Sequence, residues 1–312
     1  MTDPTAQADT TPEADATTQA NPAPQADATA HADTTAQARV TDSTAMPALT
    51  ATSLREGDGD RVLVVLPSLG TAVEPLWRAA VEELPADWTV VGVDLPGHGR
   101  SAAIADGDGP AAGDPVASTT IAELAEAVLA AVRQALPQAS TFAVAGDSVG
   151  GAIALQLALD HPDAIEAVAA FCTGAKIGQA EAWNDRAAHV EAAGAESMVD
   201  GSRQRWFAPG FADAYPVIAG ELLGSLAATE RHSYAAVCRA LAAFDVRDQL
   251  ERVRVPVLAV AGEHDVPTPA ASLEEIASGV PDGRLVVVDD AAHLVPAEAP
   301  AATARLLTDM LG

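Results

Sequence analysis

Basic residues are scarce in this chain, and lysine is almost absent. Its 312 residues include 17 Lys and Arg against 44 Asp and Glu, which gives a formal net charge of −27, and Lys176 is the only lysine. A chain of this charge repels phosphates, so we expect neither nucleic acid nor an anionic membrane surface as a partner. The simpler interpretation of the charge is that it keeps the protein soluble.

Cysteines and long apolar runs are also rare. Cys172 and Cys238, both with apolar neighbours, are too few for a disulfide framework or a metal-ligand cluster. They predict reduced core residues of a cytoplasmic protein, and we expect no metal and no cofactor. No apolar run approaches the ~18 residues of a membrane span. A hydrophobic share of 49% is nevertheless ample for a core.

Residues 1–46 contain no aromatic side chain and almost nothing large and apolar. Such a segment cannot bury enough surface to offset the entropy of ordering it, so we expect a disordered tail. It lacks the basic start and apolar core of a secretory signal. Its acids outnumber Arg39, which argues against an amphipathic targeting peptide.

From Leu49 onward, short β-branched runs alternate with longer Ala-rich stretches. This alternation is typical of an α/β fold with a mostly parallel sheet, whose strands are nearly continuously apolar because helices cover both faces. The predicted strands are Arg61–Leu66, Thr89–Asp94, Thr141–Ala145, Ile165–Phe171, Val255–Ala261 and Arg284–Val288. The predicted helices are Pro75–Leu84, Thr119–Ala135, Val149–Asp160, Pro269–Ser278 and Ala297–Leu311.

The alternation stops once, in residues 173–246, where the periodicity is helical and aromatic residues including Trp183 and Trp206 occur. A helical insert between two parallel strands is expected over the strand ends, where such sheets bind ligands. We therefore predict a core of residues 47–172 and 247–312 with a helical cap of residues 173–246. The alternative is a separate helical domain without a role in the site.

The most informative segment is Gly146-Asp147-Ser148-Val149-Gly150, a G-x-S-x-G pattern between an apolar run and a helical stretch. A serine on so tight a strand-to-helix turn is strained, and glycines on both sides let strand and helix approach each other. A chance match is common in a chain rich in Gly, Ala and Ser. Here the flanking strand and helix are those that the motif requires, so we predict that Ser148 is a nucleophile.

A nucleophilic serine needs a base, and the base needs an orienting acid, in the chain order Ser, Asp or Glu, His. Asp265 and His293 each follow a predicted strand in that order. The alternatives are Glu263 or Asp289 for the acid. For the base they are His264, on the wrong loop, His161, at a helix end, and His98, on a loop that braces rather than reacts.

An oxyanion hole needs two N–H donors, one from the residue after the nucleophile and one from the loop after the first long strand. These positions are Val149 and Leu69, the latter within Pro67-Ser68-Leu69-Gly70-Thr71. The alternative for that loop is an ordinary strand-to-helix turn.

Three further segments resemble one family within the α/β-hydrolase superfamily, the 3-oxoadipate enol-lactonases. They are Ser68–Trp77, the stretch Thr173–Arg186 with its Ala-Lys-Ile-Gly, and Arg205-Trp206-Phe207 with Phe211. The resemblance covers residues 63 to 312 and implies an α/β-hydrolase fold with a helical cap. The strands expected before Leu63 are compressed into residues 46–60, so the edge of the sheet should be short.

The resemblance implies a serine hydrolase that opens a small anionic enol-lactone to 3-oxoadipate in aromatic-compound catabolism. A protein of net charge −27 needs a local cation to hold such a substrate. Lys176 and Arg205 are the candidates, with Trp183 and Trp206 as further substrate-binding residues; surface charge is the alternative for both cations. Other functions compatible with the fold are another carboxylesterase, a C–C bond hydrolase, or a non-catalytic binding protein.

The tail can be tested by deletion. We expect removal of residues 1–45 to leave the melting temperature and the hydrolytic activity unchanged, because a disordered segment contributes no buried contacts. Thermal unfolding and ester hydrolysis of both chains check this. A drop of several degrees would show instead that the tail docks on the folded part.

Overall fold

A seven-stranded sheet in the order β1-β3-β2-β4-β5-β6-β7 organises the computed structural model, which describes residues 47–104 and 118–312. The predicted tail, residues 1–46, lies outside the described residues. Only β1 runs antiparallel to its neighbour. The strands are β1 (Ala51–Arg55), β2 (Val62–Leu66), β3 (Thr89–Val93), β4 (Phe142–Asp147), β5 (Ile165–Phe171), β6 (Val257–Gly262) and β7 (Gly283–Val288).

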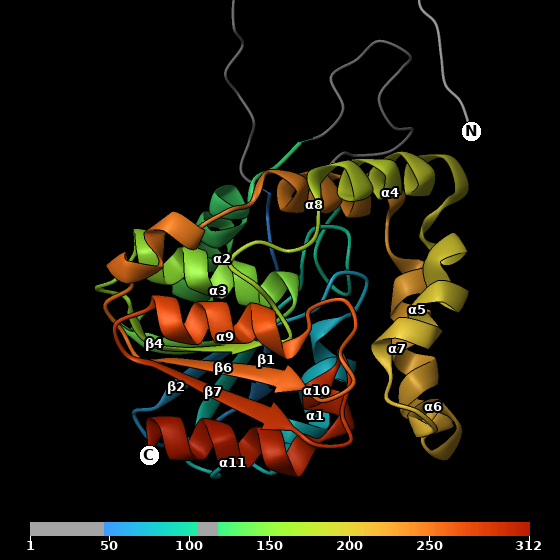
Figure 1. Ribbon diagram of the computed structural model, residues 1–312. Helices are drawn as coiled ribbons and strands as arrows, with labels where there is room; N and C mark the ends of the chain where they lie inside the picture. The colour runs from blue at the N-terminus through green and yellow to red at the C-terminus, as the bar shows by residue number, and fades with distance from the viewer. Residues whose placement is uncertain (1–46, 105–117) are drawn as a thin grey trace, which may run out of the picture. The chain divides into compact units, whose positions relative to one another are not determined.

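Helices cover both faces of the sheet, with α2, α3 and α9 on one and α1, α10 and α11 on the other (Figure 1). This arrangement confirms the predicted α/β class. The core helices are α1 (Val73–Glu82), α2 (Ile121–Ala135), α3 (Val149–Asp160), α9 (Ala270–Gly279), α10 (Val295–Glu298) and α11 (Pro300–Leu311). The short 3-10 helix η2 (Arg247–Arg252) precedes β6.

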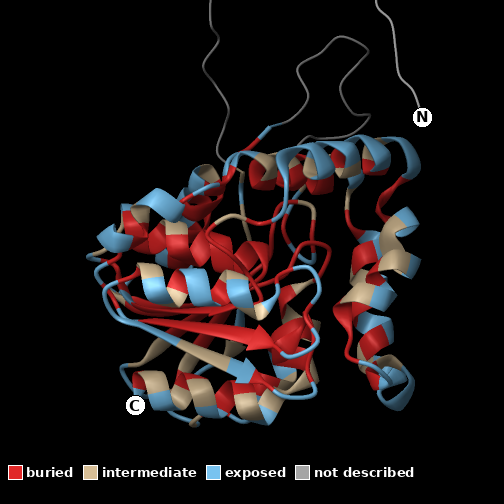
Figure 2. Cartoon of the chain, in the orientation of Figure 1, coloured by how far each residue is buried: buried red, intermediate tan, exposed pale blue. Residues whose placement is uncertain are grey.

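The insert between β5 and β6 consists of helices and the loops that join them. Its residues 173–246, all of them described, contain no strand. Its helices are α4 (Ala180–Ala193), the 3-10 helix η1 (Ala195–Met198), α5 (Val199–Trp206), α6 (Phe211–Ala214), α7 (Pro216–Ala228) and α8 (Arg231–Ala243). The central strands and α3 are buried, whereas the outer faces of the cap helices are exposed (Figure 2). Because α3 is apolar on all sides, it occupies the centre of the core.

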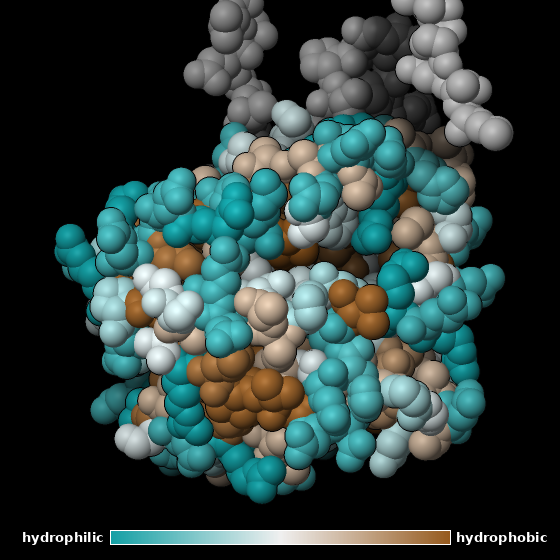
Figure 3. All heavy atoms as spheres, viewed as in Figure 1, coloured by the Kyte–Doolittle hydropathy of each residue, from teal (hydrophilic) through white to brown (hydrophobic). Residues whose placement is uncertain are grey.

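Two sequence expectations need correction. Residues 297–311 do not form one helix: α10 ends at Glu298 and α11 starts at Pro300, because a residue before proline avoids the helical region and Ala299 adopts φ −133°. β7 is not covered on both sides, since it is the edge strand and Val287 is 43% exposed. Apolar side chains gather in this area in Figure 3.

The N-terminal edge is short, as the compressed sequence predicts. The described residues 47–60 supply only β1, which pairs antiparallel with β3 through Ala51 to Arg55. The strands that matter for the site are the central ones. The carboxyl ends of β2, β4, β6 and β7 face the same edge because these strands are parallel, and the loops after them carry the candidate site residues.

Candidate active site

Ser148 occupies a strained turn between β4 and α3, with φ 56° and ψ −115°. The turn closes because its neighbours lack side chains: a Cβ at Gly146 would collide with the carbonyl of Gly150, and one at Gly150 would collide with Pro67. Two hydrogen bonds hold the strained residue, from its N–H to the carbonyl of Phe171 (2.9 Å) and from Thr173 Oγ1 to its carbonyl (2.6 Å). The hydroxyl thereby stays aimed away from the core.

A cavity of about 210 Å³ lies in front of Ser148, between core and cap. The core contributes Ser68, Leu69, Ser148 and His293 to its wall. The cap contributes Trp183, Arg186, Arg205, Trp206 and Tyr234. The predicted nucleophile and the predicted base therefore face one enclosed space.

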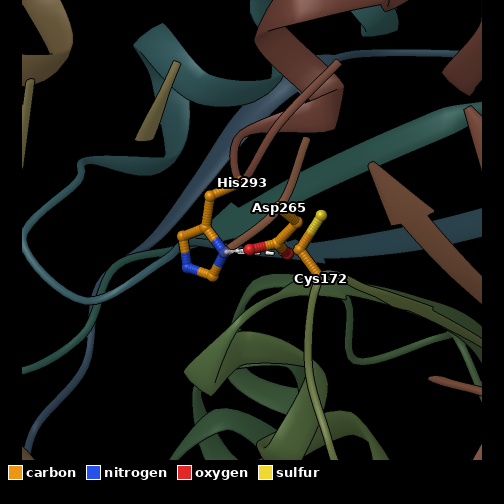
Figure 4. Close-up of side chains that lie close together, drawn as sticks. All are labelled: Cys172, Asp265 and His293. Atoms are coloured by element: carbon orange, nitrogen blue, oxygen red, sulfur yellow. Dashed lines mark hydrogen bonds and ion pairs between the residues drawn. The ribbon is translucent and has the colours of Figure 1, made fainter. Parts of the chain in front are cut away.

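His293 and Asp265 are paired behind this cavity. His293 Nδ1 lies 3.1 Å from each carboxylate oxygen of Asp265 (Figure 4), and both residues are buried. Thr268 completes the shell, because its N–H donates to Oδ1 (3.1 Å) and its hydroxyl to Oδ2 (2.7 Å). Burial alone would raise the pKa of Asp265, but the facing imidazole and these hydrogen bonds outweigh it and lower that pKa. An ionised Asp265 only accepts hydrogen bonds, so Nδ1 carries the proton and Nε2 is left as the basic atom.

The loop after β2 supplies the second expected N–H donor. Leu69 lines the cavity, and Val149 is the first residue of α3, whose N–H has no partner within the helix. Among the described residues neither N–H donates to another backbone group, whereas Gly70 N–H already donates to His98 Nε2 (3.0 Å). Leu69 is thus better placed than Gly70 as an oxyanion donor.

Two cap arginines face the cavity without a carboxylate partner. Within residues 47–104 and 118–312, neither Arg186 nor Arg205 forms an ion pair. Arg186 stacks over the ring of Trp183 at 4.6 Å. Burial and then the charge of Arg186 lower the pKa of Arg205, which places two like charges near each other. This uncompensated charge is suited to an anion.

The expectation for Lys176 is wrong. Its ammonium lies 3.4 Å from Asp245, which Arg247 also binds, and it does not line the cavity. A flexible lysine reaches an exposed carboxylate more readily than the inside of the cap. The cavity wall contains Arg186 instead, which is not among the residues predicted from the sequence. The available signal was its position three residues after Trp183, which puts both side chains on one face of α4.

Comparison with known proteins assigns the family. A family model described as alpha/beta hydrolase fold matches residues 61–193. The chain is 34% identical over 248 residues to 3-oxoadipate enol-lactonase 2 of Acinetobacter baylyi, covering 79% of this chain and 87% of the relative. It is 34% identical over 242 residues to a pimeloyl-[acyl-carrier protein] methyl ester esterase of Neisseria meningitidis, covering 71% and 84%. The chain belongs to the α/β-hydrolase family.

A solved structure agrees with this assignment. The enol-lactonase from Burkholderia xenovorans superposes on this hydrolase with a TM-score of 0.75 at 30% identity, covering 84% of this chain and 96% of the other. No helix in the part of the chain that the structure describes has the length and apolarity to cross a membrane.

The alternative site residues of this hydrolase lie elsewhere. His264 is exposed beside Glu263, and His161 pairs with Glu126 outside the cavity. Cys172 is close to Asp265 and His293, but burial raises the pKa of its thiol well above the ordinary value. A metal would require the thiolate, so this group does not suit one. Glu263, His264 and Asp290 form a second group, which is exposed.

Asp147 is a buried carboxyl group that is not among the site residues predicted from the sequence. It precedes Ser148, is fully buried, and neither of its oxygens has a hydrogen-bond partner among the described residues. Burial, followed by the charges of Asp265 and Glu298, raises its pKa well above the ordinary value. Asp147 therefore favours the neutral form while Asp265 stays ionised.

His98 braces the loop of Leu69 and should make stability depend on pH. Its Nδ1 bonds the carbonyl of Pro96 at 2.7 Å and its Nε2 accepts from Gly70, so the buried ring is neutral. Burial lowers its pKa to about 4, below the ~6.5 of an unfolded chain. The unfolded state thus binds the proton first. The free energy of unfolding therefore decreases as pH falls from ~6.5 to ~4, and the total decrease below both pKa values is ~3 kcal/mol.

We expect His98→Asn to flatten this part of the pH dependence, measured by urea unfolding at pH ~7 and ~4.5. The exposed His189→Asn is the matched control and should keep the pH dependence of the parent protein. If His98→Asn and His189→Asn behave alike, His98 is not the group that titrates.

Proposed function

We propose that this hydrolase opens the ring of 3-oxoadipate enol-lactone to give 3-oxoadipate. The observation that carries the proposal is the unpaired Arg186 and Arg205 in the cavity that Ser148 and His293 share. The substrate contains a lactone carbonyl and a carboxylate. The cavity contains a nucleophile for the carbonyl and two cations for the carboxylate. The similarity to the two Acinetobacter baylyi enol-lactonases, at 34% and 32% identity, supports it.

In the first half of the reaction Ser148 Oγ attacks the lactone carbonyl while His293 Nε2 takes the hydroxyl proton. The Leu69 and Val149 N–H groups receive the oxyanion, where one such donor contributes ~10²–10³ in rate. The ring C–O bond breaks, and the leaving enolate is protonated and becomes a ketone. Loss of the enol by tautomerisation makes this step effectively one-way.

In the second half His293 activates water, which attacks the acyl-enzyme and releases the second carboxylate of the product. Asp265 holds the imidazole tautomer and stabilises its positive charge through both steps. The roles of Ser148, Asp265, His293, Leu69 and Val149 are thus those that the chain order proposes.

The size of the cavity supports a small substrate. About 210 Å³ is below the usual range of drug-sized ligand pockets, ~300–1,000 Å³. The esterase relatives act, by name, on a pimeloyl group attached to a carrier protein. A cavity of this volume suits a substrate as small as the lactone.

Substitution of the proposed triad should separate chemistry from folding. Ser148→Ala and His293→Ala should each reduce kcat for the lactone by several orders of magnitude, and Asp265→Asn by less, while circular dichroism stays unchanged. A larger loss from His264→Ala than from His293→Ala would disprove the choice of base.

The anion site can be tested with Arg186→Met and Arg205→Met, and with Lys176→Met as the matched control. Losing a charge-assisted hydrogen bond worth about 1.5–3 kcal/mol should raise KM for the anionic lactone ~10- to 100-fold. The carboxylate is remote from the reacting carbonyl and is bound equally in ground and transition states, so kcat should change little.

A neutral phenyl ester serves as the second substrate. Its KM should change little in either arginine variant, and Lys176→Met should resemble the parent on both substrates. Equal increases in KM for the charged and the neutral substrate would show that the arginines have a structural role and do not bind the carboxylate. Turnover of a pimeloyl methyl ester in preference to the lactone would reject the proposed substrate.

A further inference from the structure

One carboxylate joins the cap to the loop of His293. Glu298, the last residue of α10, accepts three backbone N–H groups from two segments. Its Oε1 accepts from Ala292 (3.0 Å) and Leu294 (3.2 Å), the residues on either side of His293. Its Oε2 accepts from Ala208 (2.6 Å), which follows α5 in the cap.

A second bond ties the same two segments. The backbone N–H of His293 donates to the carbonyl of Trp206 at 3.1 Å, and Trp206 lines the cavity. The backbone of the proposed base is therefore held on both sides by Glu298 and in the middle by the cap.

The three donors require a carboxylate in particular. A carboxylate has two accepting oxygens and no N–H, so both can face donors at once, and hydrogen bonds to a charged acceptor are stronger than neutral ones. Burial raises the pKa of Glu298, while the three N–H groups act in the opposite direction. Glutamine of the same shape would satisfy one side of the link and point its own N–H₂ at the other.

We propose that Glu298 is a positioning residue that fixes the cap segment Trp206–Ala208 and the backbone of His293 to each other. The position of the cavity wall at Trp206 and the position of the imidazole are then set by one group. This rests on the proposed function only in assigning His293 as the base. A shift of the imidazole by about 1 Å is enough to cost ~10²-fold in rate.

The test uses Glu298→Gln and Glu298→Ala in the full chain. The matched control is Glu263→Gln, since Glu263 also accepts an N–H from this loop, that of Asp290 (3.1 Å), but lies on the surface and lacks a cap contact in the described residues. The readouts are the rate of labelling by a fluorophosphonate, kcat and KM for phenyl acetate, and the melting temperature. The fluorophosphonate and phenyl acetate report on Ser148 and His293 whether or not the lactone is the natural substrate.

We expect Glu298→Gln to lower the labelling rate and kcat about 10- to 100-fold with KM nearly unchanged, and Glu263→Gln to leave them within two-fold. A role in folding alone would lower the melting temperature and leave the labelling rate of the folded protein intact. That result would overturn the proposal. If the parent protein is labelled at a normal rate but does not hydrolyse the lactone, the proposed substrate is rejected and the proposal for Glu298 is not affected.

Ala208→Pro tests the cap side by itself, and it remains informative where Glu298→Ala does not fold. It removes the Ala208 N–H that Glu298 accepts, and Phe207 already has the extended backbone, φ −114° and ψ 142°, that a residue before proline adopts. We expect faster hydrogen exchange in the peptide of residues 290–295 and slower labelling. Faster exchange confined to residues 206–211, with a normal labelling rate, would show that the cap is not coupled to His293.

Discussion

The strained turn at Ser148 is the constraint on which the rest of the structure depends. A residue with φ 56° in the turn between β4 and α3 persists only if its surroundings hold it, and the glycines at 146 and 150 together with bonds to Phe171 and Thr173 do so. Because β4 is the central strand and α3 the most buried helix, the turn is anchored by the core on both sides. The other site residues lie on loops that follow strands parallel to β4, namely β2, β6 and β7.

The charge of the cavity wall differs from that of the protein as a whole. Overall it is strongly acidic, yet the described cavity wall contains two arginines and no carboxylate. Three carboxyl groups lie behind that wall in different states. Asp265 is kept ionised by His293 and Thr268, whereas burial favours the neutral form of Asp147. Glu298 is bound to backbone N–H groups. An imidazolium that forms at His293 therefore meets one ionised partner within hydrogen-bonding distance, which is the arrangement that general-base catalysis needs.

The cap does more than cover the strand ends. It provides the cations and aromatic rings of the cavity and also holds the backbone of His293 through Trp206 and, by way of Glu298, through Ala208. Cap helices and core loops are distant in sequence, but the carboxyl edge of the sheet brings them into contact. A change of substrate preference by altering the cap would therefore also affect the geometry of the proposed base.

The sequence by itself determined the α/β class, most strand and helix positions, the helical insert, and the order Ser148, Asp265, His293 at the strand ends. These features are local: they follow from apolar runs, glycine placement and chain order. Only the tertiary structure decided that Arg186 rather than Lys176 faces the cavity, that the buried Asp147 has no hydrogen-bond partner among the described residues, and that Glu298 bridges to Ala208. Which side of a helix faces inward depends on how that helix is rotated against the core, and a bridge over 90 residues depends on a fold that no single segment specifies.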